Sequence, residues 1–301
     1  MLQHMRYDTV SVESQVLSFG AVRSLVGRGN GMQVIAITGG KGGVGKTNIA
    51  VNLAVSMSME GLDVMLFDAD LGLANVDVVL GMQVKHTLAD VISGEKTLAD
   101  VVVDGPEGLR LIPAASGVAQ MVEMQSGQQE KLIRELSDQL LPPDVLIVDT
   151  GAGIDQTVQT FVAACQSAVL VVCDEPASLT DAYALMKVLR AKKDIRRFEI
   201  LANQVDNPLQ GKQLFERIAN VSDRYLDVEL GYLGAIPTDM YLRRAVQERR
   251  ALVSAYPRSP AAIAIRDAGR RLNRLAPRSQ SSGVGFFVEQ LLSQQAHAVR
   301  H

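Results

Sequence analysis

The stretch GGKGGVGKTNIA at residues 39–50 decides the fold. Its part from Gly40 to Thr47 fits the pattern G-x-x-x-x-G-K-[ST], directly follows the apolar run QVIAIT at residues 33–38, and opens a helical pattern. A glycine-rich turn between a strand and a helix is the setting of a phosphate-binding loop, because backbone N–H groups and the positive end of the helix then surround the phosphates. The stretch therefore predicts a nucleotide-binding α/β fold.

The loop carries two lysines where a phosphate-binding loop needs one. Lys46 is expected to reach the β- and γ-phosphates, and the Thr47 hydroxyl is expected to hold Mg²⁺. Lys41 has no such role within the same subunit. If two subunits meet face to face across their nucleotides, each Lys41 can contact the phosphates of the other, like an arginine finger supplied in trans. The nucleotide-binding residues expected on the loop are Gly39, Gly40, Lys41, Gly42, Gly43, Val44, Gly45, Lys46, Thr47 and Asn48.

Acidic residues end two further apolar runs. LFDAD carries Asp68 and Asp70, and LIVDTGAG carries Asp149, followed by Gly151 and Gly153. Because open α/β sheets bind ligands at the carboxyl ends of their strands, these acids are expected beside the phosphate loop. Asp149 is predicted to hold Mg²⁺ through water, and the N–H groups of Gly151 and Gly153 are predicted to be free to sense the γ-phosphate. The alternative is that each strand-end acid only caps a helix.

Short apolar runs alternate with helical patterns along the chain. Near-continuous apolar strands separated by helices indicate a doubly wound, mostly parallel sheet with helices on both faces. The predicted strands are 33–38, 63–68, 109–114, 144–149, 168–174, 198–203 and 230–237. A helix is predicted over 47–61, and another over 178–193 with Ser178 as its cap. The repeated TLADV at 87–91 and 97–101 predicts two short helices.

The α/β core is expected to span residues 31–275, with an appendage at each end. Residues 1–30 end in GRGNG and form a predicted N-terminal arm and linker. Residues 276–301 are predicted to form a polar hinge and a C-terminal amphipathic helix. The apolar residues of that helix are Phe286, Phe287, Val288, Leu291 and Leu292. An apolar face of this kind suits an anionic membrane surface, a groove of its own core, or a partner protein.

The composition is that of an ordinary globular chain, with 47% hydrophobic and 21% charged residues and a net charge of −3. Its two cysteines, Cys165 and Cys173, indicate neither a disulfide framework nor a zinc site, so a reducing compartment is expected. The sequence shows no secretory signal and no apolar run of the roughly 18 residues of a spanning helix. A cytoplasmic protein is expected, at most peripheral on the inner face of the membrane or at the cell pole.

The runs KGGVGKT, FDADLGLANVD and VDTGAG together resemble the deviant Walker A ATPases, the family of MinD, ParA and the nitrogenase iron protein. The resemblance covers about residues 31–275. It implies ATP and Mg²⁺ as cofactors, slow hydrolysis of ATP to ADP and phosphate, and an ATP-dependent homodimer in which the extra lysine crosses between subunits. It also implies that Asp70 positions the attacking water and that Asp68 lies in the outer coordination shell of Mg²⁺. The catalytic residues implied are Lys41, Lys46 and Asp70.

The same resemblance implies where the nucleobase binds. LANQV carries Asn203 at the position that contacts adenine in the family. AIPTD matches the loop whose backbone, at Pro237 and Asp239, lines the base. One position departs from the family pattern, because Gly151 stands where proline or alanine is frequent.

Further runs resemble the FleN/FlhG branch of the family, namely DADLGLANVDVVLG, TLADVI, IPAASG, VVCDEPASLTDAYALMKVL, SDRYLDV and FFVEQLL. That branch limits flagellar number, so the resemblance implies restraint of a FleQ-type AAA+ transcription activator and partnership with the polar GTPase FlhF. No direct sequence-specific DNA binding is expected. The motif D-Q-A-x-x-L-R of many such proteins is absent, because Asp8 is followed by Thr9 and Val10, so the role of the arm is left open.

Two alternatives stay open from the sequence, and a third is weak. Residues 243–278 hold ten arginines and only two acids, a run typical of solvated helix faces or of a docking surface for an acidic partner, lipid or DNA, so a ParA-like partition ATPase that binds DNA non-specifically is one alternative. A MinD-like regulator of the division site is another. An enzyme with an iron–sulfur cluster shared across a dimer needs two suitably placed cysteines, which Cys165 on a helix and Cys173 inside a strand do not offer.

Overall fold

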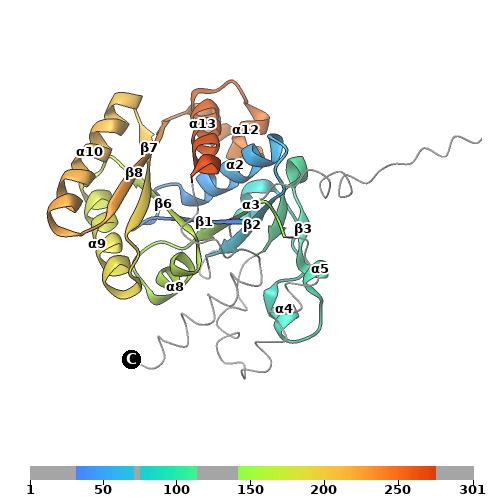
Figure 1. The fold of residues 1–301 in the computed structure, drawn as a ribbon. Helices are drawn as coiled ribbons and strands as arrows, with labels where there is room; N and C mark the ends of the chain where they lie inside the picture. The colour runs from blue at the N-terminus through green and yellow to red at the C-terminus, as the bar shows by residue number, and fades with distance from the viewer. Residues whose placement is uncertain (1–31, 71–74, 114–141, 276–301) are drawn as a thin grey trace, which may run out of the picture. The chain divides into compact units, whose positions relative to one another are not determined.

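The computed structural model describes residues 32–70, 75–113 and 142–275, which form a sheet with helices on both sides (Figure 1). The strands are β1 (Gln33–Thr38), β2 (Val64–Ala69), β3 (Val103–Asp104), β4 (Arg110–Ile112), β5 (Val145–Thr150), β6 (Ser167–Cys173), β7 (Arg197–Val205) and β8 (Glu229–Pro237). The helices are α2 (Lys46–Met59), α3 (Val76–Leu80), α4 (Leu88–Ile92), α5 (Leu98–Val101), the 3-10 turn η1 (Pro106–Gly108), α8 (Gln156–Ala164), α9 (Pro176–Lys193), α10 (Pro208–Tyr225), α11 (Met240–Gln247), α12 (Leu252–Ala255) and α13 (Pro260–Arg274).

The strands follow the order β3-β4-β2-β5-β1-β6-β7-β8. Every neighbouring pair is parallel except β3 and β4, so the predicted doubly wound, mostly parallel sheet is confirmed. The predicted strands are all present, and their ends shift by at most two residues. Because β1 lies between β5 and β6, the loop that follows β1 leaves the sheet at its centre, where α/β sheets bind ligands.

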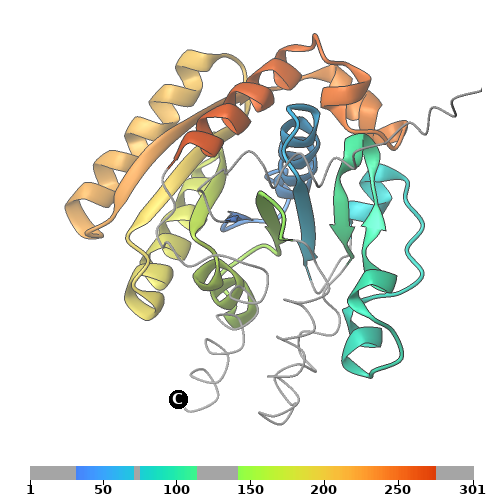
Figure 2. The same cartoon turned by 45° about the vertical axis from the view of Figure 1, so that its right-hand side comes forward.

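Alternate residues of the central strand pack into two separate hydrophobic cores. Ile35 and Ile37 of β1 pack into the core that includes α2, α12 and α13, whereas Val34 and Ala36 pack into the core that includes α8, α9 and α10. Figure 2 shows α13 and α8 on opposite sides of the sheet. Since helices cover both faces, the carboxyl ends of the strands are where a ligand can reach the sheet.

The predicted helices are present, with one change at a start. α9 begins at Pro176, so the predicted cap Ser178 is wrong and lies inside the first turn. A proline suits the first helical position, because its fixed φ is helical and its missing N–H has no partner there in any case. Ser178 Oγ instead accepts a hydrogen bond from the N–H of Cys173 (3.1 Å) and ties β6 to α9. The two TLADV copies form α4 and α5, as predicted.

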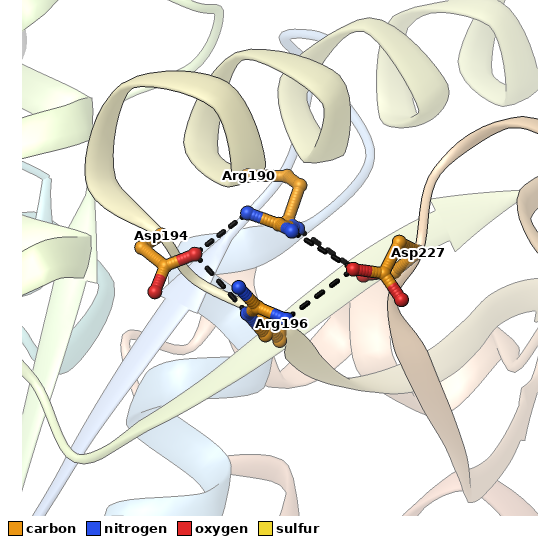
Figure 3. Close-up of polar contacts among 4 residues, drawn as sticks. All are labelled: Arg190, Asp194, Arg196 and Asp227. Atoms are coloured by element: carbon orange, nitrogen blue, oxygen red, sulfur yellow. Dashed lines mark hydrogen bonds and ion pairs between the residues drawn. The ribbon is translucent and has the colours of Figure 1, made fainter.

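An ionic cluster of four residues joins α9, β7 and β8 at the amino ends of these strands (Figure 3). Arg190 contacts Asp194 at 2.6 Å and Asp227 at 2.8 Å. Arg196 contacts the same two acids at 3.1 and 3.3 Å. The hydrogen bond from Arg190 holds the pKa of Asp227 below its usual range. The cluster fixes the end of α9 that lies away from the phosphate loop.

Two predicted segments lie outside the described residues. These are the N-terminal arm and the C-terminal helix with Phe286, Phe287, Val288, Leu291 and Leu292, so the domain boundaries at 30 and 275 stay predictions. In the part of the chain that the structure describes, no helix combines the length and the apolar composition needed to cross a membrane.

Candidate nucleotide-binding site

The phosphate loop connects β1 to α2 at the centre of the sheet. Gly43 and Gly45 have φ angles of 80° and 90°, in the left-handed region that glycine adopts without strain. Gly45 is the N-cap of α2, and as a glycine it has no side chain to accept a hydrogen bond from the first N–H groups of this helix. Free N–H groups at a helix start, together with the positive helix dipole, form an anion-binding site.

Gly40 lets the loop approach the backbone of α9. A Cβ atom at Gly40 would lie 2.2 Å from the carbonyl oxygen of Asp181, too close for any side chain. A Cβ atom at Gly39 would lie 3.1 Å from the carbonyl oxygen of Val171 on β6. The first half of the loop is therefore packed between β6 and α9.

Lys46 is buried at the base of the loop, with 8% of its surface exposed. Its Nζ donates a long hydrogen bond of 3.4 Å to the carbonyl oxygen of Lys41. Burial lowers the pKa of Lys46, and the nearby carboxylates of Asp149 and Asp70 oppose this shift. A buried cation so placed favours an anionic ligand on the loop, as predicted for the β- and γ-phosphates.

Asp149 and Asp68 lie side by side, paired in register on β5 and β2. Asp149 is 1% exposed, and its Oδ1 atom has no hydrogen-bond partner among the described residues. Burial raises the pKa of Asp149 to about 7, while a hydrogen bond from the Thr47 hydroxyl opposes the shift. A buried carboxylate oxygen without a partner beside a threonine hydroxyl fits a divalent cation, which would satisfy both.

The surroundings of this pair suit Mg²⁺ in particular. Among the described residues, no group of three or more His, Cys, Asp or Glu side chains could hold a metal ion by itself. Mg²⁺ is usually held by one or two protein ligands together with waters and phosphate oxygens. Thr47 and Asp149 therefore fit an ion that arrives with a nucleotide.

Asp68 organises the backbone that follows β2. Its carboxylate accepts hydrogen bonds from the N–H groups of Asp70 (3.2 Å), Asn75 (3.2 Å) and Val76 (3.3 Å). Burial raises the pKa of Asp68, and these three bonds oppose the shift. Asp68 therefore acts as a cap for nearby backbone N–H groups, which was the alternative considered from the sequence. Its bond to the N–H of Asp70 also helps to position Asp70.

Asp70 lies against the segment that follows β5. A Cβ atom at Gly151 would lie 3.5 Å from Asp70 Oδ1. Burial lowers the pKa of Lys46 and raises that of Asp149, and the charge of the Asp70 carboxylate opposes the first shift and adds to the second. The structure therefore brings Asp70 close to the phosphate loop and to the predicted switch glycines.

The N–H of Gly153 is engaged, contrary to the prediction that it is free. It donates a hydrogen bond of 3.2 Å to the carbonyl oxygen of Gly39. Thr150 Oγ1 donates to the carbonyl oxygen of Ile37 at 3.1 Å, next to the same loop. The segment from Thr150 to Gly153 is thus attached to the start of the phosphate loop, and this backbone contact has no signature in the side-chain pattern.

Lys41 contacts its own subunit. Its Nζ lies 2.7 Å from Glu175 Oε2, at the start of α9, with the two side chains 39% and 58% exposed. Asp174, the residue before Glu175, is bonded by Arg217 and by Gln210 of α10 at 2.9 Å, which fixes the end of β6. Sequence reasoning did not predict Glu175, although the two consecutive acids that follow the apolar strand VVC were a usable signal.

The residues expected at the nucleobase lie at the same sheet edge. Asn203 is the last residue of β7 that pairs with β6, and it is 3% exposed, with its Nδ2 donating to the carbonyl oxygen of Val44 (2.8 Å). Pro237 ends β8. The carboxylate of Asp239 accepts from the N–H groups of Tyr241 (2.9 Å) and Ala261 (3.0 Å), which leaves its backbone as the part that can line a ligand.

Comparison with known proteins decides the family. The family model of the CobQ/CobB/MinD/ParA nucleotide-binding domain matches residues 35–253. The chain belongs to this family. Its members of the MinD/ParA type are P-loop ATPases, and the predicted recognition is confirmed.

Relatives within the MinD/ParA family include flagellar proteins. The chain is 50% identical over 266 residues to the Antiactivator FleN of Pseudomonas aeruginosa, covering 88% of this chain and 95% of FleN. It is 38% identical over 224 residues to the flagellum site-determining protein YlxH of Helicobacter pylori, covering 74% and 76% of the two chains. A solved structure of MinD from Pyrococcus horikoshii in complex with Mg-ADP is 25% identical, with a TM-score of 0.63, and covers 81% of this chain and 96% of that MinD.

Proposed function

We propose that this MinD/ParA-family protein is an ATP-dependent dimerisation switch that limits flagellar number. The observation that carries the proposal is that the two lysines of the loop occupy different environments, which suit different roles. Lys46 is buried where it can meet the phosphates of its own nucleotide, whereas Lys41 is exposed and contacts Glu175. An exposed lysine beside a nucleotide site is available to a second subunit.

Binding depends on groups within one chain. The N–H groups at the start of α2 and the Lys46 ammonium receive the phosphates, and Thr47 with Asp149 would hold the Mg²⁺ that arrives with them. The ion would neutralise charge on the phosphate oxygens. Asp70 lies near enough to Lys46 to affect its pKa, and we assign it the orientation of the attacking water.

Hydrolysis depends on the second chain. Two triphosphates that face each other repel, and Lys41 from each subunit would offset the charge on the nucleotide of the other. To do so, Lys41 must leave Glu175 in its own subunit. This exchange makes dimerisation conditional on ATP, because only the triphosphate offers Lys41 a stronger anion than the carboxylate that it leaves.

The names of the relatives support a flagellar role. FleN is called an antiactivator and YlxH a flagellum site-determining protein. We assign to this chain the restraint of a FleQ-type AAA+ activator by the ATP-bound dimer, together with action beside the GTPase FlhF. The proposed domains are the arm 1–30, the ATPase domain 31–275 and the helix-bearing tail 276–301.

The test combines assembly with partner capture. Sedimentation velocity of the full chain should give a dimer with Mg-ATP and a monomer with Mg-ADP. Purified FleQ-type activator should co-elute with the dimer and not with the monomer. An activator that binds equally in ADP, or not at all, would contradict the switch.

We also propose that the predicted C-terminal helix binds an anionic membrane surface, and this can be tested separately. Deletion of residues 283–301 removes the apolar residues of the predicted terminal helix, so co-sedimentation with anionic vesicles should fall while ATP affinity stays. Equal pelleting of the truncated and full-length chains would show that this helix is not the anchor.

A second candidate function is favoured by the exposed arginines in the segment from α11 to α13. Arg243, Arg249, Arg250, Arg258 and Arg274 are all exposed in this segment. Their charge suits non-specific DNA binding of the ParA type. Binding of arbitrary-sequence duplex DNA that falls steeply with salt would support it, and absence of such binding at low salt would exclude it.

A further inference from the structure

The phosphate loop is held from outside by two consecutive side chains of β7. Asn203 Nδ2 donates a hydrogen bond to the carbonyl oxygen of Val44 (2.8 Å), and Gln204 Nε2 donates one to the carbonyl oxygen of Gly43 (3.3 Å). Cys173 Sγ contacts the Val44 oxygen as well, at 3.7 Å. Two successive carbonyls of the loop therefore face the ends of β6 and β7.

A local irregularity lets both side chains reach the loop. Neighbours on a regular strand point to opposite faces of the sheet. Gln204 has a φ of 57°, in the left-handed region, and the pairing of β7 with β8 shifts register between Asn203 and Val205. This conformation is unfavourable for a residue with a Cβ atom and persists where surrounding contacts enforce it. The bulge therefore indicates that the contact of Gln204 with the loop matters.

The loop and the strand end also fit closely in shape. A Cβ atom at Gly45 would lie 2.6 Å from Asn203 Nδ2, so a side chain there would displace the Asn203 amide, and the φ of 90° also favours glycine. Asn203 is 3% exposed and forms part of the wall, whereas Gln204 is exposed. The Gln204 amide can therefore be removed without leaving a cavity in the core.

The direction of these carbonyls decides the direction of the neighbouring N–H groups. In a trans peptide the C=O and N–H groups point opposite ways. The Gly43 carbonyl shares its peptide with the Val44 N–H, and the Val44 carbonyl shares its peptide with the Gly45 N–H. Holding both carbonyls toward β7 turns both N–H groups the other way, as an anion-binding nest requires.

We propose that Asn203 and Gln204 order the phosphate loop before its ligand binds, with Gln204 as a positioning residue. The inference rests on the proposed function, since it takes the loop to bind the phosphates of ATP. The family resemblance places Asn203 at the adenine, so its loss affects base and loop together. Gln204 acts on the loop alone, and its loss should weaken every ligand with these phosphates by the same factor.

The test compares Mg-ATP with inorganic tripolyphosphate, both measured on the full chain by displacement of a fluorescent ATP analogue. Gln204→Met keeps the length and neutrality of the side chain but has no donor. It should weaken both ligands equally, by about fivefold, the effect of one hydrogen bond. Gln213→Met, at an exposed position of α10, is the matched control and should change neither affinity.

Gln204→Gly separates positioning from a purely structural role. Glycine adopts a φ of 57° without strain, so this variant should keep the wild-type melting temperature while it loses the same fivefold in affinity. A fall in stability and affinity together would overturn the proposal. Unchanged affinity in Gln204→Met, or a loss for ATP alone, would also overturn it. A wild-type chain that binds neither ligand would refute the assignment of the loop itself, and this inference with it.

Discussion

Lys41 Nζ lies 2.7 Å from Glu175 Oε2, so the second lysine of the phosphate loop is engaged by an acid of its own subunit. The hydrogen bond and the charge of Glu175 raise the pKa of Lys41 above its ordinary value, so the contact favours the charged form of the lysine. Exposed ion pairs contribute little to stability. The contact therefore holds Lys41 in place without preventing its transfer to a stronger anion.

Removing the acid should favour the dimer. Glu175→Gln takes away the charge that competes for Lys41, so ATP-dependent dimerisation should tighten by about twofold to fivefold. The measurement is the dimer dissociation constant in Mg-ATP by analytical ultracentrifugation. Glu216→Gln, at an exposed position of α10, is the control and should leave the constant unchanged. A weaker dimer in Glu175→Gln would mean that Glu175 belongs to the dimer contact itself.

The buried lysine should be indispensable for binding. Lys46→Ala removes the ammonium at the base of the loop, and we expect ATP affinity to fall by at least about a hundredfold, the effect of a lost charged hydrogen-bonding group at a buried site. Calorimetry with Mg-ATP measures this directly. Wild-type affinity in this variant would refute the assignment of the phosphate loop.

Asp70 should act after binding. Asp70→Ala should leave ATP affinity within about twofold of wild type, because Lys46 and the loop are intact, and should reduce turnover by about 10² or more, the usual effect of losing a general base or water-orienting group. Sedimentation with ATP should then show a persistent dimer. Normal turnover from a monomeric variant would contradict the role.

Asp149 should make stability depend on pH in the absence of Mg²⁺. Its pKa is raised to about 7 by burial, above the unfolded value of about 3.9, so the folded state binds the extra proton between these two values. The contribution of Asp149 to the free energy of unfolding is therefore fully present below about pH 4. It is lost as the pH rises through 7, and the loss is at most about 4 kcal/mol. Asp149→Asn should abolish this loss of stability, and it should also abolish the increase in stability that Mg-ATP gives. Urea unfolding at pH 5 and 8.5 in EDTA measures the change in stability. The same dependence of stability on pH in the wild type and in Asp149→Asn would refute the prediction.

Local patterns predicted the parts of the site that a single segment determines. The glycines of the loop and the acids Asp68 and Asp149 stand at the ends of apolar strands, and both signals are visible in the sequence. The two residues of β3 form a strand that is too short to have a pattern. The fold and the positions of these acids could therefore be predicted from the sequence.

Contacts between segments that are far apart in the sequence could not be predicted from it. Lys41 and Glu175 are 134 positions apart, and Gly43 and Gln204 are 161 positions apart. Only the strand order β1-β6-β7 brings these segments together, and no local pattern encodes it. The left-handed φ of Gln204 was equally hidden, because glutamine gives no sign of such a conformation.

The central claim is that Lys41 acts across a dimer, and the state of assembly of Lys41→Ala tests it most directly. Sedimentation velocity and ATP turnover of this variant in Mg-ATP, with binding checked by calorimetry, give the answer in one set of samples. The account predicts ATP affinity close to wild type, because Lys46 serves the phosphates within one subunit, together with a monomeric species and no hydrolysis above background. A Lys41→Ala protein that forms ATP-dependent dimers and turns over at the wild-type rate would contradict the account.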